Sequence, residues 1–363
     1  MALKESMAEA LRLTRSGNLM EATALIQTAL GSNASFSPAS AKASGEVITL
    51  VPERILLRAP NPREPRAAAK PAPQARETDT RASFEERSYR GSQGRMNYWL
   101  YRPAKIAADA PLVVMLHGCT QSPQDFARGT GMNLLADELG LLVAYPQQNA
   151  AANPQKCWNW FRPGDQQRDR GEPDQLAGIT RQIIAEHAVD PDRVYIAGLS
   201  AGGAAAAIMA AQYPDIYAAV GVHSGLACGA ARDLPSALAA MQRGGAATRT
   251  GQGHQRFVPV ITFHGSRDAT VNEANSRQIV AAASAASAKA LEVRVSKGRS
   301  QSGRIYSTAQ HFDAAGTALI EQWTVEGLGH AWSGGHVSGT YTDPSGPDAS
   351  RAMIDFFLEQ RRT

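Results

Sequence analysis

The sequence has few cysteines, no long apolar run and no recognisable metal-binding motif. No apolar stretch among its 363 residues approaches the roughly 18 residues that a membrane-spanning helix requires. Three cysteines, an odd number, do not make a disulfide scaffold. The chain contains neither His-Glu-x-x-His nor a paired Cys-x-x-Cys, so we expect no metal and no cofactor. With 43% hydrophobic residues, the composition is that of a globular protein with an ample core.

A strong excess of charge is also missing. The net charge is +4, and residues 1–81, with 11 Lys or Arg against 8 Asp or Glu, account for +3 of it. Basic residues do not alternate with aromatic ones, so we expect no nucleic acid partner. The N-terminus lacks the apolar core of a signal peptide, since Glu5, Glu9 and Arg12 interrupt it. The sequence therefore predicts a cytoplasmic protein, with secretion as the minority alternative.

Residues 1–82 differ in composition from the rest of the chain. Residues 1–30 predict a hairpin of two short helices, because apolar residues recur at helical spacing on either side of Ser16-Gly17-Asn18. Helices this short are marginal alone, so the hairpin is expected to be a peripheral structural element or to bind a granule surface, a partner or a second copy of the chain. Residues 31–82, rich in Pro, Ala and Arg, predict an extended linker with one candidate strand at 47–51.

From residue 83 onward, apolar runs alternate with helical patterns. The first two runs flank a turn with two glycines and predict an antiparallel hairpin. Strands that alternate with helices predict an α/β fold with a doubly wound, mostly parallel sheet, in which ligands bind beyond the carboxyl ends of the strands. The predicted strands cover residues 84–89, 96–101, 111–116, 141–145, 194–199, 217–222, 258–264 and 319–325, and the predicted helices cover 131–139, 174–187, 201–212, 273–286 and 349–359.

One predicted strand ends in a Gly-x-Ser-x-Gly sequence formed by Gly198, Ser200 and Gly202. A nucleophilic serine on a sharp strand-to-helix turn needs neighbours that are almost free of side chains. The turn also places the amide of Ala201 and a helix N-terminus where negative charge develops on a reacting carbonyl. The alternative interpretation is a glycine-rich turn without a catalytic role.

Two other strand ends supply candidate partners for Ser200. Asp268 follows one predicted strand, and His330 follows the last one. The chain order Ser, Asp, His is that of α/β-hydrolases. In such a triad His330 would accept the serine proton and Asp268 would orient the imidazole. Asp190 and Asp192 precede the elbow strand, at the opposite end of the sheet, and indicate a turn.

Seven other histidines compete with His330 for the role of general base. His117 and His264 begin loops at strand ends, where we expect them to hydrogen-bond the turns. His336 shares a glycine-rich loop with His330 and is the strongest rival. The remaining candidates, for each of which a structural role is expected, are His187, His223, His254 and His311.

An oxyanion hole needs two backbone amides. Ala201 offers one, and the loop after the strand at 111–116 offers the other, most simply at Cys119. Cys119 could also approach Cys157 if the loop that contains Cys157 folds over this strand. A disulfide between them is a hypothesis, because reduced thiols are the default in the cytoplasm. Cys119 is not expected to be the nucleophile, since the serine elbow is complete.

Aromatic residues gather at two places near these loops. Trp158 and Trp160 share one face if their segment is extended. Trp332 lies two residues after His330. These tryptophans are candidates for the wall of an apolar substrate cleft, and filling the fold is the alternative.

The separated motifs resemble the polyhydroxybutyrate depolymerase-type esterases, an α/β-hydrolase family that also includes feruloyl and acetylxylan esterases. The resemblance implies hydrolysis of carboxylic esters by Ser200, Asp268 and His330, with the amides of Cys119 and Ala201 as the oxyanion hole and the tryptophan-bearing loop near the substrate. It rests on residues 117–121 (HGCTQ), 157–161 (CWNWF), 198–203 (GLSAGG), 223–225 (HSG), 329–332 (GHAW) and 346–350 (GPDAS).

We therefore expect a serine carboxylic ester hydrolase that acts through an acyl-enzyme on polyhydroxybutyrate or short-chain hydroxyalkanoate esters. A feruloyl- or acetylxylan-type esterase would use the same chemistry, and acyl transfer to an acceptor other than water is a further option. A non-catalytic granule- or partner-binding protein is the alternative of another class. The sequence departs from the secreted polymer-degrading members in lacking a signal peptide and a separate binding module, and in its residues 1–82.

Overall fold

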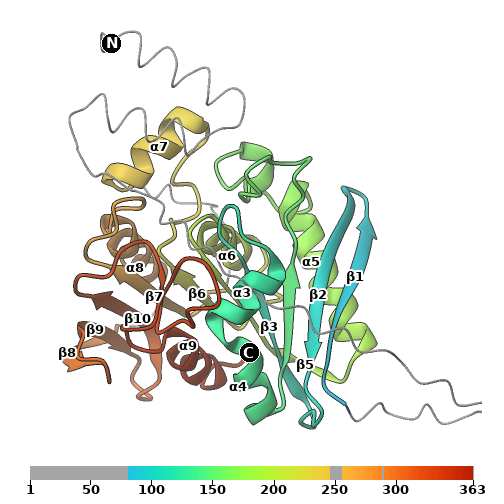
Figure 1. Cartoon of the computed structure of the whole chain (residues 1–363). Helices are drawn as coiled ribbons and strands as arrows, with labels where there is room; N and C mark the ends of the chain where they lie inside the picture. Colours follow the sequence, from blue (N-terminus) through green and yellow to red (C-terminus); the bar gives the residue numbers. More distant parts are fainter. Residues whose placement is uncertain (1–80, 246–255, 288–289, 363) are drawn as a thin grey trace, which may run out of the picture. The chain divides into compact units, whose positions relative to one another are not determined.

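The computed structural model describes residues 81–245, 256–287 and 290–362 (Figure 1). The helical hairpin expected at 1–30, the candidate strand at 47–51 and all but the last two residues of the linker at 31–82 lie outside these ranges, as does His254. The first described strand begins at Ser83, where the sequence predicts that the globular domain starts.

A ten-stranded sheet runs through the described residues in the order β1-β2-β4-β3-β5-β6-β7-β10-β9-β8. The six strands from β4 to β10 pair in parallel, whereas β1 and β2 at one edge and β9 and β8 at the other pair antiparallel. The strands are β1 (Ser83–Gly91), β2 (Gly94–Arg102), β3 (Ala110–Leu116), β4 (Leu142–Pro146), β5 (Val189–Leu199), β6 (Ala219–His223), β7 (Val260–Gly265), β8 (Glu292–Arg299), β9 (Ile305–Phe312) and β10 (Ala318–Val325), with a separate short pair β11 (Trp332–Ser333) and β12 (Thr342–Asp343).

Helices cover both faces of this sheet, as Figure 1 shows. On one face α5, α6, α7 and α8 share a hydrophobic cluster with the strands, and on the other face α3, α4 and α9 share a second cluster. Buried β3 contributes alternate residues to the two clusters, as its continuous apolar sequence predicts. The helices are α3 (Pro123–Thr130), α4 (Met132–Leu139), α5 (Gly171–Glu186), α6 (Ala201–Gln212), α7 (Leu234–Arg243), α8 (Ala274–Ala286) and α9 (Ala349–Leu358), with a 3-10 turn η1 (Pro163–Gln166).

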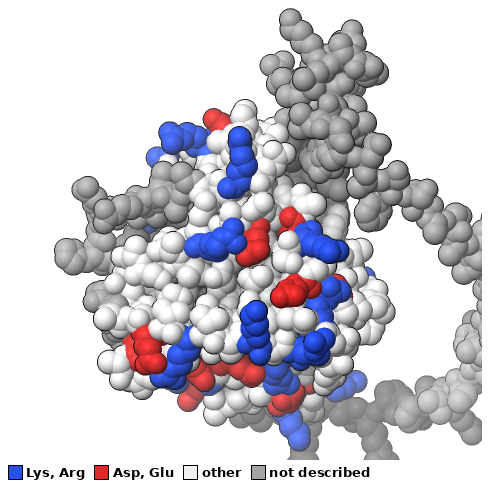
Figure 2. All heavy atoms as spheres, turned by 90° about the vertical axis from the view of Figure 1, so that its left-hand side faces the viewer, with Lys and Arg blue, Asp and Glu red and all other residues white. Residues whose placement is uncertain are grey.

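The mostly parallel, doubly wound α/β sheet expected from the sequence is confirmed, but two of its strands and two of the helices that cover it were not predicted. Strands β8 and β9 have few apolar residues in alternation, and β8 is largely exposed on both faces. Charges of both signs lie side by side on the face shown in Figure 2. Within β8, Glu292 and Arg294 form an ion pair. Charged side chains on an edge strand oppose pairing with a further strand. Helices α3 and α7 are short and were not predicted either.

Within the described ranges, no helix combines the length and the apolar composition needed to cross a bilayer. The same ranges contain no group of three or more His, Cys, Asp or Glu side chains arranged to bind a metal ion.

Helix α9 packs on the sheet with several buried side chains, of which Phe357 is fully buried. Its ring is stacked on that of Tyr195 of β5, with a centroid distance of 5.0 Å. The substitution Phe357→Ala should lower the free energy of unfolding by about 3–5 kcal/mol, because it removes a large buried ring and leaves a cavity. Urea unfolding measures this change, with Glu359→Ala at an exposed position of the same segment as the control. Equal stability of the two variants would contradict the role given to this contact.

Candidate active site

Ser200 lies between β5 and α6 in a strained backbone conformation, with φ 58° and ψ −120°. A non-glycine residue in this region costs on the order of 1–3 kcal/mol and persists only where its surroundings fix it. Two hydrogen bonds do so here: the Ser200 amide donates to the His223 carbonyl over 2.9 Å, and the Ser200 carbonyl accepts from the Ala204 amide. The strand, turn and helix that the sequence predicts around this serine are present.

The two glycines of the elbow have no room for a side chain. A Cβ on Gly198 would lie 2.4 Å from the carbonyl of Gly202. A Cβ on Gly202 would lie 2.1 Å from the carbonyl oxygen of Leu116 and 2.6 Å from that of His117. The loop that follows β3 therefore packs directly on the N-terminus of α6, and this contact brings the predicted oxyanion loop next to the serine turn.

Asp268 and His330 are hydrogen-bonded to each other, as the sequence-based triad requires. His330 Nδ1 lies 2.7 Å from Asp268 Oδ2, and the Asp268 side chain is fully buried. The other carboxylate oxygen accepts from the amides of Thr270 and Val271. Burial raises the pKa of Asp268, but the bond and charge of His330 and the Val271 amide outweigh it, so the pKa lies below its ordinary value. An ionised Asp268 accepts from Nδ1–H and leaves Nε2 of His330 as a base.

Sheet order brings the three predicted triad residues to one edge. Strands β5, β6, β7 and β10 are consecutive and parallel, so Ser200, Asp268 and His330 all follow carboxyl ends of neighbouring strands. The acid loop and the base loop touch, since a Cβ on Gly265 would lie 2.2 Å from the Leu328 carbonyl oxygen. The arrangement can support attack by a serine on a carbonyl carbon with proton transfer to an imidazole.

Two of the rival histidines, His264 and His336, have structural partners in their own loops. His264 Nε2 lies 2.7 Å from the Val271 carbonyl oxygen and 3.6 Å from Asp268 Oδ2, so this ring supports the acid loop. His336 is exposed and bonds Ser338 within its own turn. At the opposite end of the sheet, Asp190 and Asp192 lie within the first residues of β5 and not in a turn before it, and the Asp190 side chain accepts from the Asp192 amide.

His223 was a rival for the base and instead holds the loop that bears His330. Its Nε2 accepts a hydrogen bond from the Ser333 amide over 3.0 Å, and its ring is stacked on Trp332 at 4.9 Å. Burial holds the pKa of His223 well below its usual range, so the ring is neutral and can accept. Its place in a His-Ser-Gly sequence directly after a buried strand was the available signal for this role.

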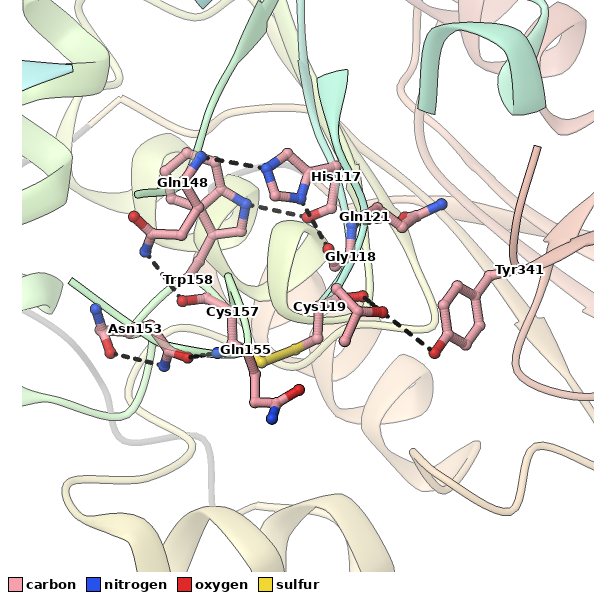
Figure 3. Close-up of a disulfide and its surroundings, with 12 residues drawn as sticks. His117, Gly118, Cys119, Gln121, Gln148, Asn153, Gln155, Cys157, Trp158 and Tyr341 are labelled. Carbon is pink, nitrogen blue, oxygen red and sulfur yellow. Dashed lines mark hydrogen bonds between the residues drawn. A yellow bond between two sulfur atoms is a disulfide. The ribbon is translucent and has the colours of Figure 1, made fainter. Parts of the chain in front are cut away.

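The predicted oxyanion loop is tied at several points to the segment around Trp158 (Figure 3). Cys119 and Cys157 form a disulfide with a Cα–Cα distance of 4.2 Å. The Thr120 amide donates to the Gln155 carbonyl, and Trp158 Nε1 donates to the His117 carbonyl. The disulfide hypothesis is thus confirmed in this structure, and the default expectation of reduced thiols is wrong for this pair.

His117 also helps to shape this loop. Its Nδ1 donates to the Gly118 carbonyl over 2.8 Å, and its Nε2 accepts from the Gln148 amide over 3.2 Å. Accepting at Nε2 requires the neutral ring, and burial lowers the pKa of His117 to about 4. Within the described residues, the amides of Cys119 and Ala201 donate no hydrogen bond to another group, which leaves both available for an oxyanion.

Two of the three tryptophans predicted to contact substrate are placed in the core instead. Trp158 is fully buried, and Trp332 is 1% exposed with its Nε1 donating to Ser350 Oγ. A ring without accessible surface cannot form a cleft wall, so the expectation is wrong for Trp158 and Trp332. Both rings pack in the core beneath the loops that carry Cys119 and His330. Trp160 is buried as well, at 6% exposure, and its contact with substrate stays a prediction.

Sequence reasoning overlooked two polar residues that organise this region. Gln148 connects His117 with Cys157 through its amide and its side chain. Glu172, in the first turn of α5, is buried and accepts from Gln148 and Asn159. A buried carboxylate is unusual, but nothing in the local pattern of α5 distinguishes Glu172 from an exposed acidic residue near a helix N-terminus.

Residues 96–296, which contain Ser200, the loop after β3 and Asp268, match the family model described as Esterase PHB depolymerase. The chain belongs to this family. Poly(3-hydroxyalkanoate) depolymerase C of Paucimonas lemoignei is 34% identical over 267 residues, which are 69% of this chain and 60% of that protein. Feruloyl esterase B of Thermothelomyces thermophilus is 32% identical over 142 residues, 38% of this chain and 47% of that protein.

This chain therefore spans about half the length of these curated relatives. Among solved structures, an acetyl xylan esterase from Aspergillus awamori superposes with a TM-score of 0.57 at 18% identity, over 76% of this chain and 99% of that one. At this identity the likeness establishes the fold, which is the α/β-hydrolase fold that the order of Ser200, Asp268 and His330 predicted.

The neutral state of His117 makes its contribution to stability depend on pH. Its pKa is lower in the folded protein than the usual 6.5, so folding is increasingly opposed as pH falls below 6.5 toward 4. The stability advantage of the wild type over His117→Asn should shrink by about 2 kcal/mol between pH 7 and pH 5. Urea unfolding at both pH values measures the difference. Ser92→Ala, without a titrating group, is the control, and a pH-independent difference for His117→Asn would contradict the assignment.

Proposed function

We propose that this protein is a serine carboxylic ester hydrolase with Ser200 as nucleophile, His330 as general base and Asp268 as the acid that orients it. The observation that carries the proposal is the strained Ser200 turn on the same sheet edge as the hydrogen-bonded Asp268–His330 pair. A turn of this kind exposes a hydroxyl next to a helix N-terminus, where developing negative charge is stabilised. Membership in a family of esterases supports the same reaction.

In the first half-reaction, Ser200 Oγ attacks the ester carbonyl carbon while His330 Nε2 takes its proton. The carbonyl oxygen becomes an oxyanion and accepts from the amides of Cys119 and Ala201. Asp268 stabilises the imidazolium through Nδ1–H. Collapse of the tetrahedral intermediate breaks the bond to the alcohol oxygen, which receives the proton from His330, and leaves an acyl-enzyme.

In the second half-reaction, water replaces the alcohol. His330 removes a proton from water as the water oxygen attacks the acyl carbon, and the oxyanion forms again between the same two amides. Return of the proton to Ser200 Oγ releases the carboxylic acid. An acceptor other than water would give acyl transfer by the same steps.

The substrate class proposed first is polyhydroxybutyrate or a short-chain hydroxyalkanoate ester. The family description and the 34% identical relative, named as a poly(3-hydroxyalkanoate) depolymerase, support it. A feruloyl- or acetylxylan-type esterase is the second candidate, because relatives with those names match a shorter part of the chain. A granule- or partner-binding role for residues 1–30 is a further proposal about residues outside the described ranges.

The Cys119–Cys157 disulfide bears on the compartment. Disulfides form and persist in oxidising compartments and are rare in the cytosol. The pair therefore favours the alternative of a secreted protein over the cytoplasmic location expected from the first residues. Recovery of Cys119 and Cys157 as a linked peptide from protein isolated under thiol-trapping conditions would support an oxidising compartment, and recovery of trapped free thiols would support the cytoplasm.

The first test is the release of 3-hydroxybutyrate from amorphous polyhydroxybutyrate granules. The wild type should release the acid, and Ser200→Ala should lower kcat by a factor on the order of 10⁶, because the nucleophile is lost. His330→Ala should nearly abolish turnover as well. Ser92→Ala, at the β1–β2 turn, is the matched control and should behave as the wild type.

Comparing the polymer with a small ester tests the serine hydrolase chemistry separately from the choice of substrate. Cleavage of a short nitrophenyl ester without release from granules would retain the serine hydrolase and replace the polymer by small acetyl or feruloyl esters. Undiminished hydrolysis by a pure Ser200→Ala sample would refute the proposed nucleophile. Failure of a fluorophosphonate probe to label Ser200 would revive the non-catalytic alternative.

A second test removes residues 1–80. Turnover of a small soluble ester should stay within about twofold of the full chain, because every proposed catalytic group lies in residues 117–330. Nitrophenyl ester hydrolysis per folded molecule measures this. A large fall in kcat would show that the N-terminal residues complete the active site.

A further inference from the structure

Glu172 is a buried carboxylate that the proposed reaction does not use. It lies in the first turn of α5 and is 7% exposed. Its Oε1 accepts from Gln148 Nε2 over 2.5 Å and from Asn159 Nδ2 over 2.6 Å, and its Oε2 accepts from the Asn159 amide over 2.8 Å. Within the described residues no Lys or Arg pairs with it, so neutral N–H groups and the N-terminus of α5 are what stabilise its charge.

Both partners of Glu172 lead to the oxyanion loop. The Gln148 amide donates to His117 Nε2 over 3.2 Å, and Gln148 Nε2 also donates to the Cys157 carbonyl over 2.9 Å. Asn159 directly follows Trp158, whose indole donates to the His117 carbonyl over 3.0 Å. Figure 3 shows Gln148 and Trp158 on the same side of His117, with the disulfide to Cys119 below them. A single carboxylate thus holds two segments that contact different atoms of His117.

The chemistry of this arrangement requires an acceptor at both carboxylate oxygens. Three N–H groups point at them, and an ionised carboxylate has only acceptor sites. An amide in its place would direct its own N–H₂ at one of the donors, leaving a buried donor without a partner. Burial, with the charge of Asp165 nearby, raises the pKa of Glu172 to about 7. Ionising Glu172 in this place therefore costs free energy that an apolar side chain would not.

We propose that Glu172 is a positioning residue of the oxyanion hole: its carboxylate fixes Gln148 and Asn159, and through His117, Cys157 and Trp158 these fix the amide of Cys119. The expected effect on kcat rests on the proposed hydrolase function, whereas the effect of Glu172 on the loop does not. Glu172 does not touch the substrate. It acts on the orientation of an amide that is needed more in the tetrahedral state than in the ground state.

The test compares Glu172→Gln with Glu186→Gln, an exposed position at the other end of α5. Amide hydrogen exchange of residues 117–121 and of Gln148 is measured first, because it needs no catalysis. We expect exchange at these amides to be about tenfold faster in Glu172→Gln and unchanged in Glu186→Gln. On a short nitrophenyl ester, kcat per folded molecule should fall at least tenfold with KM within twofold, and affinity for a boronic acid that forms a tetrahedral adduct should fall in parallel.

Each outcome decides the proposal. Exchange and kcat in Glu172→Gln equal to those of Glu186→Gln would overturn it. A fall in activity that disappears once the amount of folded enzyme is counted would also overturn it, since Glu172 would then serve global stability alone. If exchange accelerates locally but the wild type cleaves no ester, the proposed function fails while the positioning role of Glu172 stands.

Discussion

The backbone at Ser200 is the constraint on which the rest of the site depends. A serine at φ 58° returns to an ordinary conformation unless its neighbours prevent it, and here the elbow is enclosed on two sides. On one side the His223 carbonyl, at the end of β6, accepts a hydrogen bond from the Ser200 amide. On the other side the carbonyls of Leu116 and His117 lie so close to Gly202 that not even a methyl group fits. The packing that keeps Ser200 in this strained conformation therefore also fixes the position of the loop that carries Cys119.

Three buried histidines hold the loops around this turn in place. His117, His223 and His264 are buried, and burial lowers the pKa of each, so that each ring is neutral and offers a donor and an acceptor. His117 holds the loop that carries Cys119, His223 holds the loop that carries His330, and His264 holds the loop that carries Asp268. The one imidazole that pairs with a buried carboxylate over 2.7 Å is that of His330 among the described residues. The geometry thus distinguishes the proposed base from three structural rings of the same chemical type.

Much of this was accessible from the sequence because it depends on local pattern and strand order. Apolar β3 to β7 gave continuous runs, and Gly198, Ser200 and Gly202 needed only their spacing. The errors arose where long-range packing decides. Trp158 and Trp332 have the same local sequence whether they face a cleft or the core, and only their partners, the His117 carbonyl and Ser350, distinguish the two. Strand β8 has only Val293 and Val295 as apolar residues, and this short alternation gives a weak signal because both side chains are exposed.

Glu172 shows why a site of this kind extends beyond the residues that react. An oxyanion amide stabilises the transition state only if it is preoriented, because reorienting it during the reaction would consume the free energy it supplies. A loop alone does not provide such rigidity. Here the Cys119 segment is held by a covalent bond to Cys157 and by hydrogen bonds that converge on one buried carboxylate. Since a buried carboxylate is costly and three buried N–H donors would be costly without it, the two penalties cancel only when all partners are present together. Cooperativity of that kind keeps a loop in one conformation.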